Sequence, residues 1–374
     1  MSQNYELLEG KFLHVELDGR PYEIGQKLGN LFRFNKGFIT FLSSGRLNFQ
    51  KTGLKDFKEL KSMFENYCPG INEELQGLAD ALEVDPTKLI YYSDSFSLPT
   101  TCSHVAILPS ITKDKRAYVG RSYEWTHNEE DLVLATTKPL NAYSHIGFTC
   151  LLSGRHEGIN EHGLTITASG GGIFNVPTKN KGLKFWFVIR SLLEQCKTVD
   201  EAKELIERMP LSQFNNFLII DDHSKALLVE SADGEKAFKE IDGTTKDEQF
   251  ISATNHYKLQ PTIEYNKLNG GIISHSKKRT EIITDKISKF SPEITKEDIR
   301  NLFSERHPYG LCDHHYKDYY GTLWSMIFDI PERQVDICFG APTHNEWKSF
   351  NLHDSVKISE YPVIFPNVEE KDWL

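Results

Sequence analysis

Residues 101–125 read TCSHVAILPSITKDKRAYVGRSYEW, and the chain changes character at this stretch. An apolar run, SHVAILPS, is followed by the polar turn TKDKR and then by a second run, RAYVGRSYEW. Apolar runs of this length on both sides of a polar turn predict two strands. Helical periodicity dominates before this stretch, and strands dominate after it. It therefore marks the border between two kinds of structure.

The residues before this border predict helices. After a short strand near 12–17, apolar residues recur at helical spacing in PYEIGQKLGNLFRF, FKELKSMFENY and INEELQGLADALEV. Asp85-Pro86 favours the start of one more helix, which would run through Tyr92. We expect residues 1–101 to form a helical N-terminal segment that packs on a catalytic core formed by residues 102–374.

The residues after the border predict strands and helices in separate groups, which favours an α+β layered fold over alternating βαβ units. Strands are expected near 132–136, 143–152, 164–169, 216–220, 226–230, 250–254, 322–329 and 334–339, and helices near 183–195, 199–208, 277–289 and 295–303.

Composition excludes several classes of partner. The 374 residues carry a formal net charge of −10, which argues against a nucleic-acid backbone as partner. No stretch approaches the roughly 20 apolar residues of a membrane helix, and the first residues lack the features of a signal peptide. Six widely spaced cysteines indicate reduced thiols rather than a disulfide framework. We expect a cytoplasmic protein that binds a small molecule, with no cofactor and no membrane contact; a homo-oligomer is left open.

Cys102 is the candidate nucleophile. A cysteine thiol becomes a competent nucleophile when a base or a positive field favours its thiolate. If the chain were cleaved before Cys102, the new α-amine, which titrates near ~8, could accept the proton of the thiol. The simpler alternative is a small buried apolar residue.

Two motifs downstream could support this thiol. In GRSYEW, Arg121 and Glu124 lie among Tyr123 and Trp125, and charges in apolar surroundings must be paired or functional. The alternative is an exposed ion pair at the end of a strand. In EGINEHGLTITASGGG, three glycines follow Ser169. Backbone N–H groups there could stabilise an oxyanion, and the alternative is a flexible turn.

Two later motifs add further candidates. ATNHY places Asn255 and His256 at the end of a predicted strand, where an amide could donate to an oxyanion and where turn formers are also common. HSKKRTEII places Arg279 at the start of a predicted helix. A solvated helix face is the alternative for that arginine.

Taken in order, these motifs resemble the acyl-coenzyme A:isopenicillin N (6-aminopenicillanic acid) acyltransferase family. This family is a branch of the choloylglycine hydrolase-like N-terminal-nucleophile (Ntn) hydrolases. The resemblance runs from about Val15 to Pro342. Its further elements are GRPYEIGQKLGNLF, PGINEELQGLADALEVD, GINEHGLTI, Ser276 with Arg279, and GTLWSMIFD followed by FGAP.

The resemblance implies a four-layer αββα sandwich with two central antiparallel sheets. It also implies that the chain cleaves itself between Thr101 and Cys102, so that residues 1–101 are propeptide-like. The activity would be that of an amidohydrolase or acyltransferase, which cleaves a linear amide C–N bond through an acyl-thioester on Cys102. The substrate would be a small-molecule amide or acyl-thioester.

The resemblance also assigns roles to residues. Cys102 would be the nucleophile and its α-amine the base, with Arg121 and Glu124 holding the thiolate and the amine. Glu124 stands where the family has Asp. Asn255 matches a residue that binds the oxyanion or the substrate amide, and Arg279 an arginine near the nucleophile. A backbone N–H of Ser169 or Gly170 would complete the oxyanion site, and Tyr123, Trp125 and His256 would contact substrate.

Two other functions remain open from the residues alone. The stretch HPYGLCDHHYKDYY holds His307, Cys312, His314 and His315, which could belong to a metal-dependent hydrolase, although their spacing fits no zinc signature. The chain could also be a catalytically silent relative that binds amides and stays uncleaved.

Overall fold

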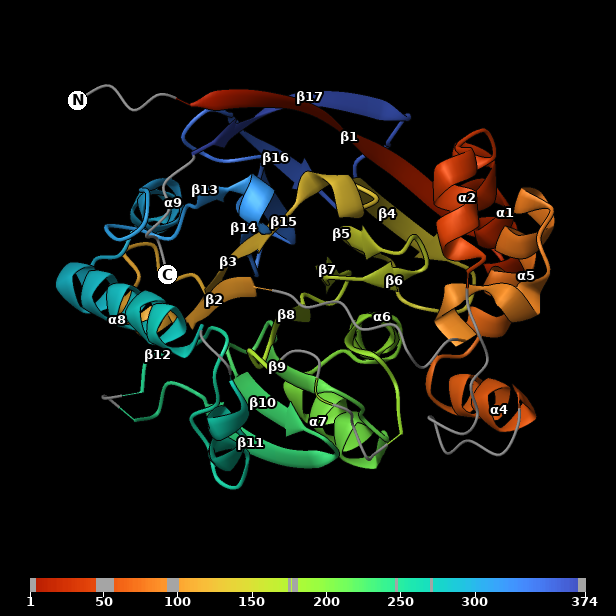
Figure 1. Cartoon of the computed structure of the whole chain (residues 1–374). Helices are drawn as coiled ribbons and strands as arrows, with labels where there is room; N and C mark the ends of the chain where they lie inside the picture. Colours follow the sequence, from red (N-terminus) through yellow and green to blue (C-terminus); the bar gives the residue numbers. More distant parts are fainter. Residues whose placement is uncertain are drawn as a thin grey trace.

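The computed structural model describes residues 5–44, 57–92, 101–173, 176, 181–245, 248–269 and 272–368. Two β-sheets lie face to face, and helices cover the outer face of each (Figure 1). The chain therefore has the α+β, four-layer αββα architecture that the sequence predicted.

The larger sheet has ten strands among the described residues, in the order β11-β10-β9-β8-β7-β5-β4-β1-β17, with β6 paired to β5. All its pairings are antiparallel except the parallel pair of β1 and β4. Its strands are β1 (Glu6–Gly19), β4 (Val133–Pro139), β5 (His145–Cys150), β6 (Gly154–Arg155), β7 (Glu157–Asn160), β8 (Thr165–Gly170), β9 (Phe214–Ile220), β10 (Ala226–Ala232), β11 (Glu235–Ile241) and β17 (Ser359–Asn367).

The smaller sheet has seven strands in the part of the chain that the structure describes. Their order is β12-β2-β3-β14-β15-β16, with β13 paired to β14, and every pairing is antiparallel. The strands are β2 (Thr101–Ile107), β3 (Tyr118–Trp125), β12 (Phe250–Ala253), β13 (His314–His315), β14 (Tyr320–Asp329), β15 (Gln334–Phe339) and β16 (Trp347–Asn351).

Three apolar clusters separate the four layers. The middle cluster, which includes Phe12, Cys102 and Trp324, lies between the sheets. A second cluster joins the larger sheet to α1 (Pro21–Phe32), α4 (Phe57–Tyr67), α5 (Ile71–Leu82), α6 (Phe185–Gln195) and α7 (Val199–Arg208). A third joins the smaller sheet to α8 (Ile273–Phe290) and α9 (Lys296–Ser304). The short α2 (Lys36–Leu42) lies beside α1 (Figure 1).

Strand alternation decides which residues reach the middle layer. In β2, Cys102 and Ala106 belong to the middle cluster, whereas Val105 and Ile107 face α8 and α9. Successive side chains of a strand point to opposite faces, so a one-residue shift would exchange the two sets. The register of β2 thus places the Cys102 side chain between the two sheets.

The N-terminal segment departs from its prediction in two places. Its first strand, β1, runs over fourteen residues, because it lies between β4 and β17 and pairs with both. The helix predicted from Asp85 through Tyr92 is instead two 3₁₀ turns, Pro86–Lys88 and Ile90–Tyr92. Ile90, Tyr91 and Tyr92 are all buried, so burial rather than helical spacing explains this apolar run.

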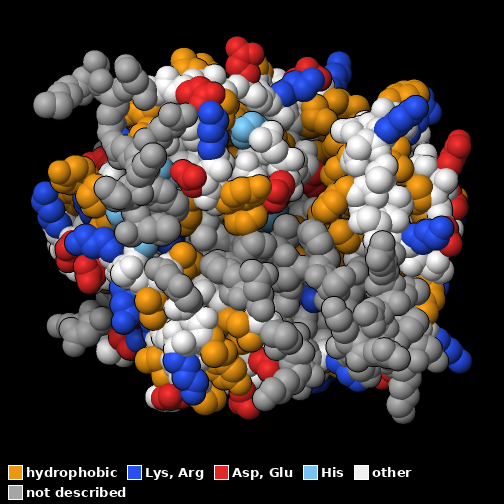
Figure 2. Space-filling view, viewed as in Figure 1, with side chains coloured by type: hydrophobic (Ala, Val, Ile, Leu, Met, Phe, Trp, Pro, Cys, Tyr) orange, Lys and Arg blue, Asp and Glu red, His pale blue; other side chains and the backbone are white. Residues whose placement is uncertain are grey.

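The surface carries charges of both signs. On the face drawn in Figure 2, basic and acidic side chains are interspersed with apolar ones, and no extended basic track crosses the coloured part. In the described part of the chain, no helix is long and apolar enough to cross a membrane.

Candidate active site

The paired strands β2 and β3 place Cys102 and Arg121 on the same face. The register matches Cys102 with Tyr123 and His104 with Arg121, and these side chains point into the middle layer. Arg121 Nη2 donates to Cys102 Sγ over 3.4 Å and to the carbonyl of Ala168 over 3.2 Å. Thiol and guanidinium are both completely buried.

Arg121 is held by Glu157, a buried residue of β7 in the opposite sheet. Arg121 Nη1 forms an ion pair with Glu157 Oε2. The carboxylate also accepts hydrogen bonds from the backbone N–H of Phe148 at 3.3 Å and from Trp324 Nε1 at 3.4 Å. A buried charge needs such partners, because an unpaired ion in the interior is strongly destabilising.

Sequence reasoning missed Glu157, although a signal was present. Glu157 precedes Ile159 by two residues in EGIN, and in an extended segment this spacing places the carboxylate on the same face as the apolar Ile159. Arg121 likewise alternates with Val119 and Tyr123. Two opposite charges on two apolar strand faces indicate a buried pair between sheets.

Burial controls the state of the thiol in the intact chain. Burial raises the pKa of Cys102 to about 12, Arg121 opposes this shift, and Glu124 adds to it. The Cys102 thiol is therefore protonated near neutral pH while the chain is uncleaved.

Arg279 approaches Cys102 from the other side of the smaller sheet. It extends from α8, and its Nη1 donates to the Cys102 carbonyl oxygen at 2.7 Å and to Ser103 Oγ at 2.8 Å. Its Nη2 donates to Asn255 Oδ1 at 2.6 Å, and its Nε donates to His275 Nδ1 at 3.2 Å. The planar fork of the guanidinium fixes the backbone around Cys102 in one orientation.

Asn255 completes this support of the Cys102 backbone. Its Oδ1 accepts the backbone N–H of Cys102 at 3.2 Å, and its Nδ2 donates to the carbonyl of Gly170 at 2.9 Å. The backbone N–H of Asn255 donates to Ser276 Oγ at 2.7 Å. Asn255, the second residue after β12, is thus fixed by the first turn of α8 and reaches both sheets.

Glu124 lies on the face of β3 opposite to Arg121. An offset of three residues in a strand separates the two side chains, because residues alternate with a period of two. Glu124 is completely buried, and burial raises its pKa to about 7, with Arg279 opposing the shift. The structure thus brings Arg121 to the thiol and Glu124 to the side of Arg279.

Ser169 and Gly170 lie at the end of β8, near Asn255. Ser169 Oγ donates to the carbonyl of Thr254 at 2.6 Å. The glycines that follow are tightly packed rather than open, since a Cβ on Gly172 would lie 2.3 Å from the Asn255 carbonyl oxygen. Gly172 also has a φ of 71°, which favours glycine.

The three residues predicted to contact substrate are all buried. Tyr123 donates its hydroxyl to Glu130, and its ring lies 4.4 Å from that of Trp324. Trp125 is 9% exposed. His256 Nδ1 lies 2.7 Å from Ser276 Oγ, and burial lowers its pKa to about 4.

The histidines near residue 310 separate into two groups. Cys312 Sγ lies 3.5 Å from His314 Nε2, which in turn lies 2.9 Å from Thr343 Oγ1. His307 instead joins His275 and Asp313, whose ligand atoms lie within 4.8 Å of one another. Among the described residues, these three could hold a metal ion.

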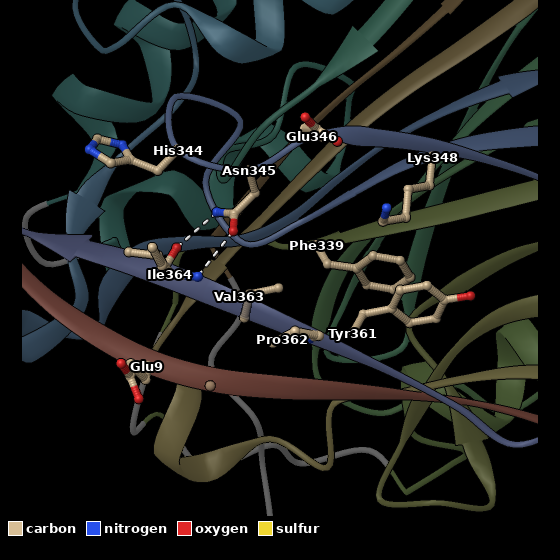
Figure 3. A pocket seen from close by; sticks show the side chains of 11 residues that line it. Glu9, Phe339, His344, Asn345, Glu346, Lys348, Tyr361, Pro362, Val363 and Ile364 are labelled. Atoms are coloured by element: carbon tan, nitrogen blue, oxygen red, sulfur yellow. Dashed lines mark hydrogen bonds between the residues drawn. The ribbon is translucent and has the colours of Figure 1, made fainter.

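Two surface hollows lie away from Cys102. One hollow has a volume of about 510 Å³ and is lined by residues of β1, β15, β16 and β17 and of the loop 344–346. The rings of Phe339 and Tyr361 stack there 4.7 Å apart (Figure 3). Another, of about 800 Å³, lies beside α1 and α6. Neither lining includes a candidate catalytic residue.

Comparison with known proteins identifies the family. The family model described as acyl-coenzyme A:6-aminopenicillanic acid acyl-transferase matches residues 111–344, a range that begins after Cys102. Penicillin V acylase from Agrobacterium tumefaciens is 14% identical over 66% of this chain and 85% of its own, with a TM-score of 0.44. A mutant conjugated bile acid hydrolase from Clostridium perfringens is 13% identical over 70% of this chain and 96% of its own, with a TM-score of 0.46. No curated protein matches this chain.

The family match extends over more than half of the residues. It confirms the resemblance inferred from the ordered sequence motifs. The chain belongs to the acyl-coenzyme A:6-aminopenicillanic acid acyl-transferase family.

Proposed function

We propose that this protein is a cysteine-nucleophile amidohydrolase or acyltransferase that uses Cys102. Family membership supports acyl-transfer chemistry in general. The contact from Arg121 Nη2 to Cys102 Sγ carries the assignment of the nucleophile. A paired, buried guanidinium beside a thiol provides the positive field that favours a thiolate.

Cleavage of the Thr101–Cys102 bond is part of this proposal. A thiol whose pKa is about 12 in the intact chain lacks a base. Cleavage would convert the Cys102 N–H that Asn255 now accepts into an α-amine, and such an amine titrates near ~8. The new amine would take the thiol proton and, still beside Asn255, would later protonate the leaving group.

The catalytic steps follow from this arrangement. The Cys102 thiolate attacks the carbonyl carbon of a linear amide, the C–N bond breaks, and the amine leaves with a proton from the α-amine. Asn255 and a backbone N–H near Ser169 or Gly170 stabilise the oxyanion, and one such donor typically contributes ~10²–10³ in rate. Water or a second amine then takes the acyl group from the thioester.

Residues 1–101 would stay bound after cleavage. Glu74 of α5 holds Arg190 of α6 through two bonds of 2.6 and 2.5 Å, and Arg190 also contacts Glu194 at 3.0 Å. Strand β1 pairs along β4 and β17. These contacts support a propeptide-like segment that remains part of the folded domain.

All six cysteines are free, and each is buried. We therefore place the protein in a reducing, cytoplasm-like compartment. The proposed substrate is a small-molecule amide or acyl-thioester, and the proposed chemistry needs no cofactor.

Intact-protein mass spectrometry tests the proposal. Wild type should give fragments of 101 and 273 residues, whereas Cys102→Ala should stay at 374 residues. Cys196→Ala is a matched control, because it also removes a buried thiol but lies at the end of α6. Incubation with chromogenic N-acyl amides should add one acyl mass to the fragment that begins with Cys102.

Two results would contradict the proposal. An uncleaved wild-type chain without acyl adducts would favour the catalytically silent relative. Cleavage in Cys102→Ala would exclude Cys102 as the nucleophile of processing.

A further inference from the structure

A cluster of three residues lies directly behind Arg279, outside the proposed catalytic steps. One ligand atom each of His275, His307 and Asp313 lies within 4.8 Å of the other two. His275 Nε2 is 3.8 Å from Asp313 Oδ2, and the rings of His275 and His307 lie 4.3 Å apart. Ligands of a tetrahedral zinc ion lie about 3.3 Å apart, so side-chain shifts of ~1 Å would close the set.

The surroundings of the three residues resemble a second coordination shell. Asp313 Oδ1 accepts from His315 Nδ1 at 2.5 Å and from the backbone N–H of His314 at 3.0 Å, which leaves Oδ2 directed at His275. Tyr320 Oη lies 3.0 Å from His275 Nδ1. Outer contacts of this kind orient carboxylate and imidazole ligands towards a metal.

An unpartnered nitrogen of His307 independently indicates that a metal ion can bind here. Its Nε2 is buried and has no hydrogen-bond partner among the described residues. A buried polar atom normally finds a partner, and each exception calls for an explanation.

We propose that His275, His307 and Asp313 form a binding site for a divalent transition-metal ion such as Zn²⁺, and that this site is linked to Cys102 through Arg279. Two imidazoles and one carboxylate are a ligand set that zinc accepts, with further positions for water or a nearby histidine. The set differs from the group formed by Cys312 and His314.

The link follows from the protonation of His275. Arg279 Nε donates to His275 Nδ1, so the neutral ring carries its proton on Nε2, towards Asp313. When a metal ion binds Nε2, the neutral ring carries its proton on Nδ1 instead. Nδ1 can then no longer accept the N–H of Arg279, and it donates to the Tyr320 oxygen. Arg279 then loses one of its fixed contacts, while it still holds Cys102 and Asn255. An occupied site should therefore loosen the support of Cys102.

Direct binding tests the site without any activity assay. Zn²⁺ is titrated into intact Cys102→Ala protein in competition with a chromophoric chelator, so that the catalytic thiol cannot bind the metal. We expect one ion per chain, and at least tenfold weaker binding in Cys102→Ala/His307→Ala. The control is Cys102→Ala/His223→Ala, which removes an exposed histidine between β9 and β10 and should bind as Cys102→Ala does.

Two outcomes would overturn the site: no stoichiometric binding by Cys102→Ala, or equal binding after His307→Ala. Circular dichroism establishes that each variant is folded. If His307→Ala does not fold, Asp313→Asn, which keeps the shape of the side chain, takes its place and should lose the same tenfold.

A second measurement tests the link to Cys102, and it rests on the proposed function. Zn²⁺ should slow amide hydrolysis by otherwise wild-type protein, a chelator should restore the rate, and His307→Ala should reduce the sensitivity to Zn²⁺. Stoichiometric binding with an unchanged rate would overturn the link. Failure of hydrolysis in every variant would count against the proposed function and would leave the binding result intact.

Discussion

Two buried arginines meet at Cys102 from opposite faces of one sheet, and they differ in what they hold. Arg121 lies between the sheets, pairs with Glu157 and contacts the Cys102 sulfur. Arg279 comes from the helical layer and contacts the Cys102 carbonyl oxygen, Ser103 and Asn255. One guanidinium acts on the side chain of Cys102 and the other on its backbone.

The two arginines separate two tasks at Cys102: control of the thiol charge and alignment of the backbone. The charge of Arg121 is compensated by a carboxylate, so its removal leaves a buried ion. Arg279 spreads its charge over oxygens of neutral groups and a histidine nitrogen, so the geometry of its fork matters most. We therefore expect Arg121 to affect folding and thiol chemistry, and Arg279 to affect alignment.

The largest expected effect is that of Arg121→Met. It leaves the Glu157 carboxylate buried without its ionic partner, and breaking a buried pair from one side typically costs about 3–5 kcal/mol. Urea unfolding monitored by tryptophan fluorescence measures the change in the free energy of unfolding.

The control for this prediction removes both charges. Arg121→Met/Glu157→Gln should recover most of the lost stability, because no ion is then left unpaired. Equal destabilisation of the single and double variants would contradict a charge-pair role for Arg121.

Glu124, on the Arg279 side, should give the protein an unusual pH dependence. Its pKa is raised to about 7 from an ordinary 4.5 by burial. The unfolded chain loses this proton at lower pH than the folded one, so stability should fall as the pH rises from 4.5 to 7 and stay level above 7. The shift corresponds to ~3 kcal/mol.

Unfolding free energies at pH 5 and pH 7.5 measure this fall. Glu124→Gln should flatten it, because the amide does not titrate. Burial also raises the pKa of Asp131 to about 7. Asp131 therefore adds to the fall in stability with pH, and Asp131→Asn should remove this part of the fall. An unchanged pH dependence in Glu124→Gln would exclude a raised pKa at Glu124.

Lysine substitutions test whether the two arginines differ in what they contribute at Cys102. Arg279→Lys keeps the charge but loses the fork, and a misplacement of ~1 Å near the reacting atoms can lower the rate about 10²-fold. Arg121→Lys keeps the positive field beside the thiol and should lower the rate less than Arg279→Lys does. Rates of the proposed amide hydrolysis and of the proposed self-cleavage measure the effect of each substitution. A larger loss of rate in Arg121→Lys than in Arg279→Lys would reverse the roles assigned to the two arginines.

Most of the fold could be predicted from local sequence patterns. The helix predicted at 199–208 matches α7, Val199–Arg208, because its hydrophobic face follows helical spacing. The strands predicted at 226–230 and 334–339 correspond to β10 and β15. Among the strands that were missed, β11 buries only two of its residues, β16 buries none, and β17 buries none of its first four, so their apolar pattern is weak and pairing with neighbouring strands stabilises them.

The candidate site could be predicted only in part, because most of its contacts join distant segments. The motif around Cys102 indicated the thiol and Arg121, which are close in sequence. The period of two in β3 already separates Glu124 from Arg121, and a helical spacing of four already places His275 next to Arg279. Local patterns place Arg121 and Glu157 each on the apolar face of a strand, but which buried charge meets which depends on how the two sheets stack.

The smallest expected effect is that of Ser103→Ala, and it measures a single contact of Arg279. Ser103 Oγ accepts from Arg279 Nη1 at 2.8 Å, while the same nitrogen also donates to the Cys102 carbonyl oxygen. The guanidinium keeps a partner, so the loss should be about 1 kcal/mol in the free energy of unfolding.

Ser325→Ala is the matched control, since this buried hydroxyl on β14 has no partner among the described residues and its removal should cost nothing. A loss of 3 kcal/mol or more in Ser103→Ala would mean that the hydroxyl, rather than the Cys102 carbonyl, anchors Arg279. The guanidinium would then depend on a side chain beside Cys102 more than on the Cys102 backbone itself.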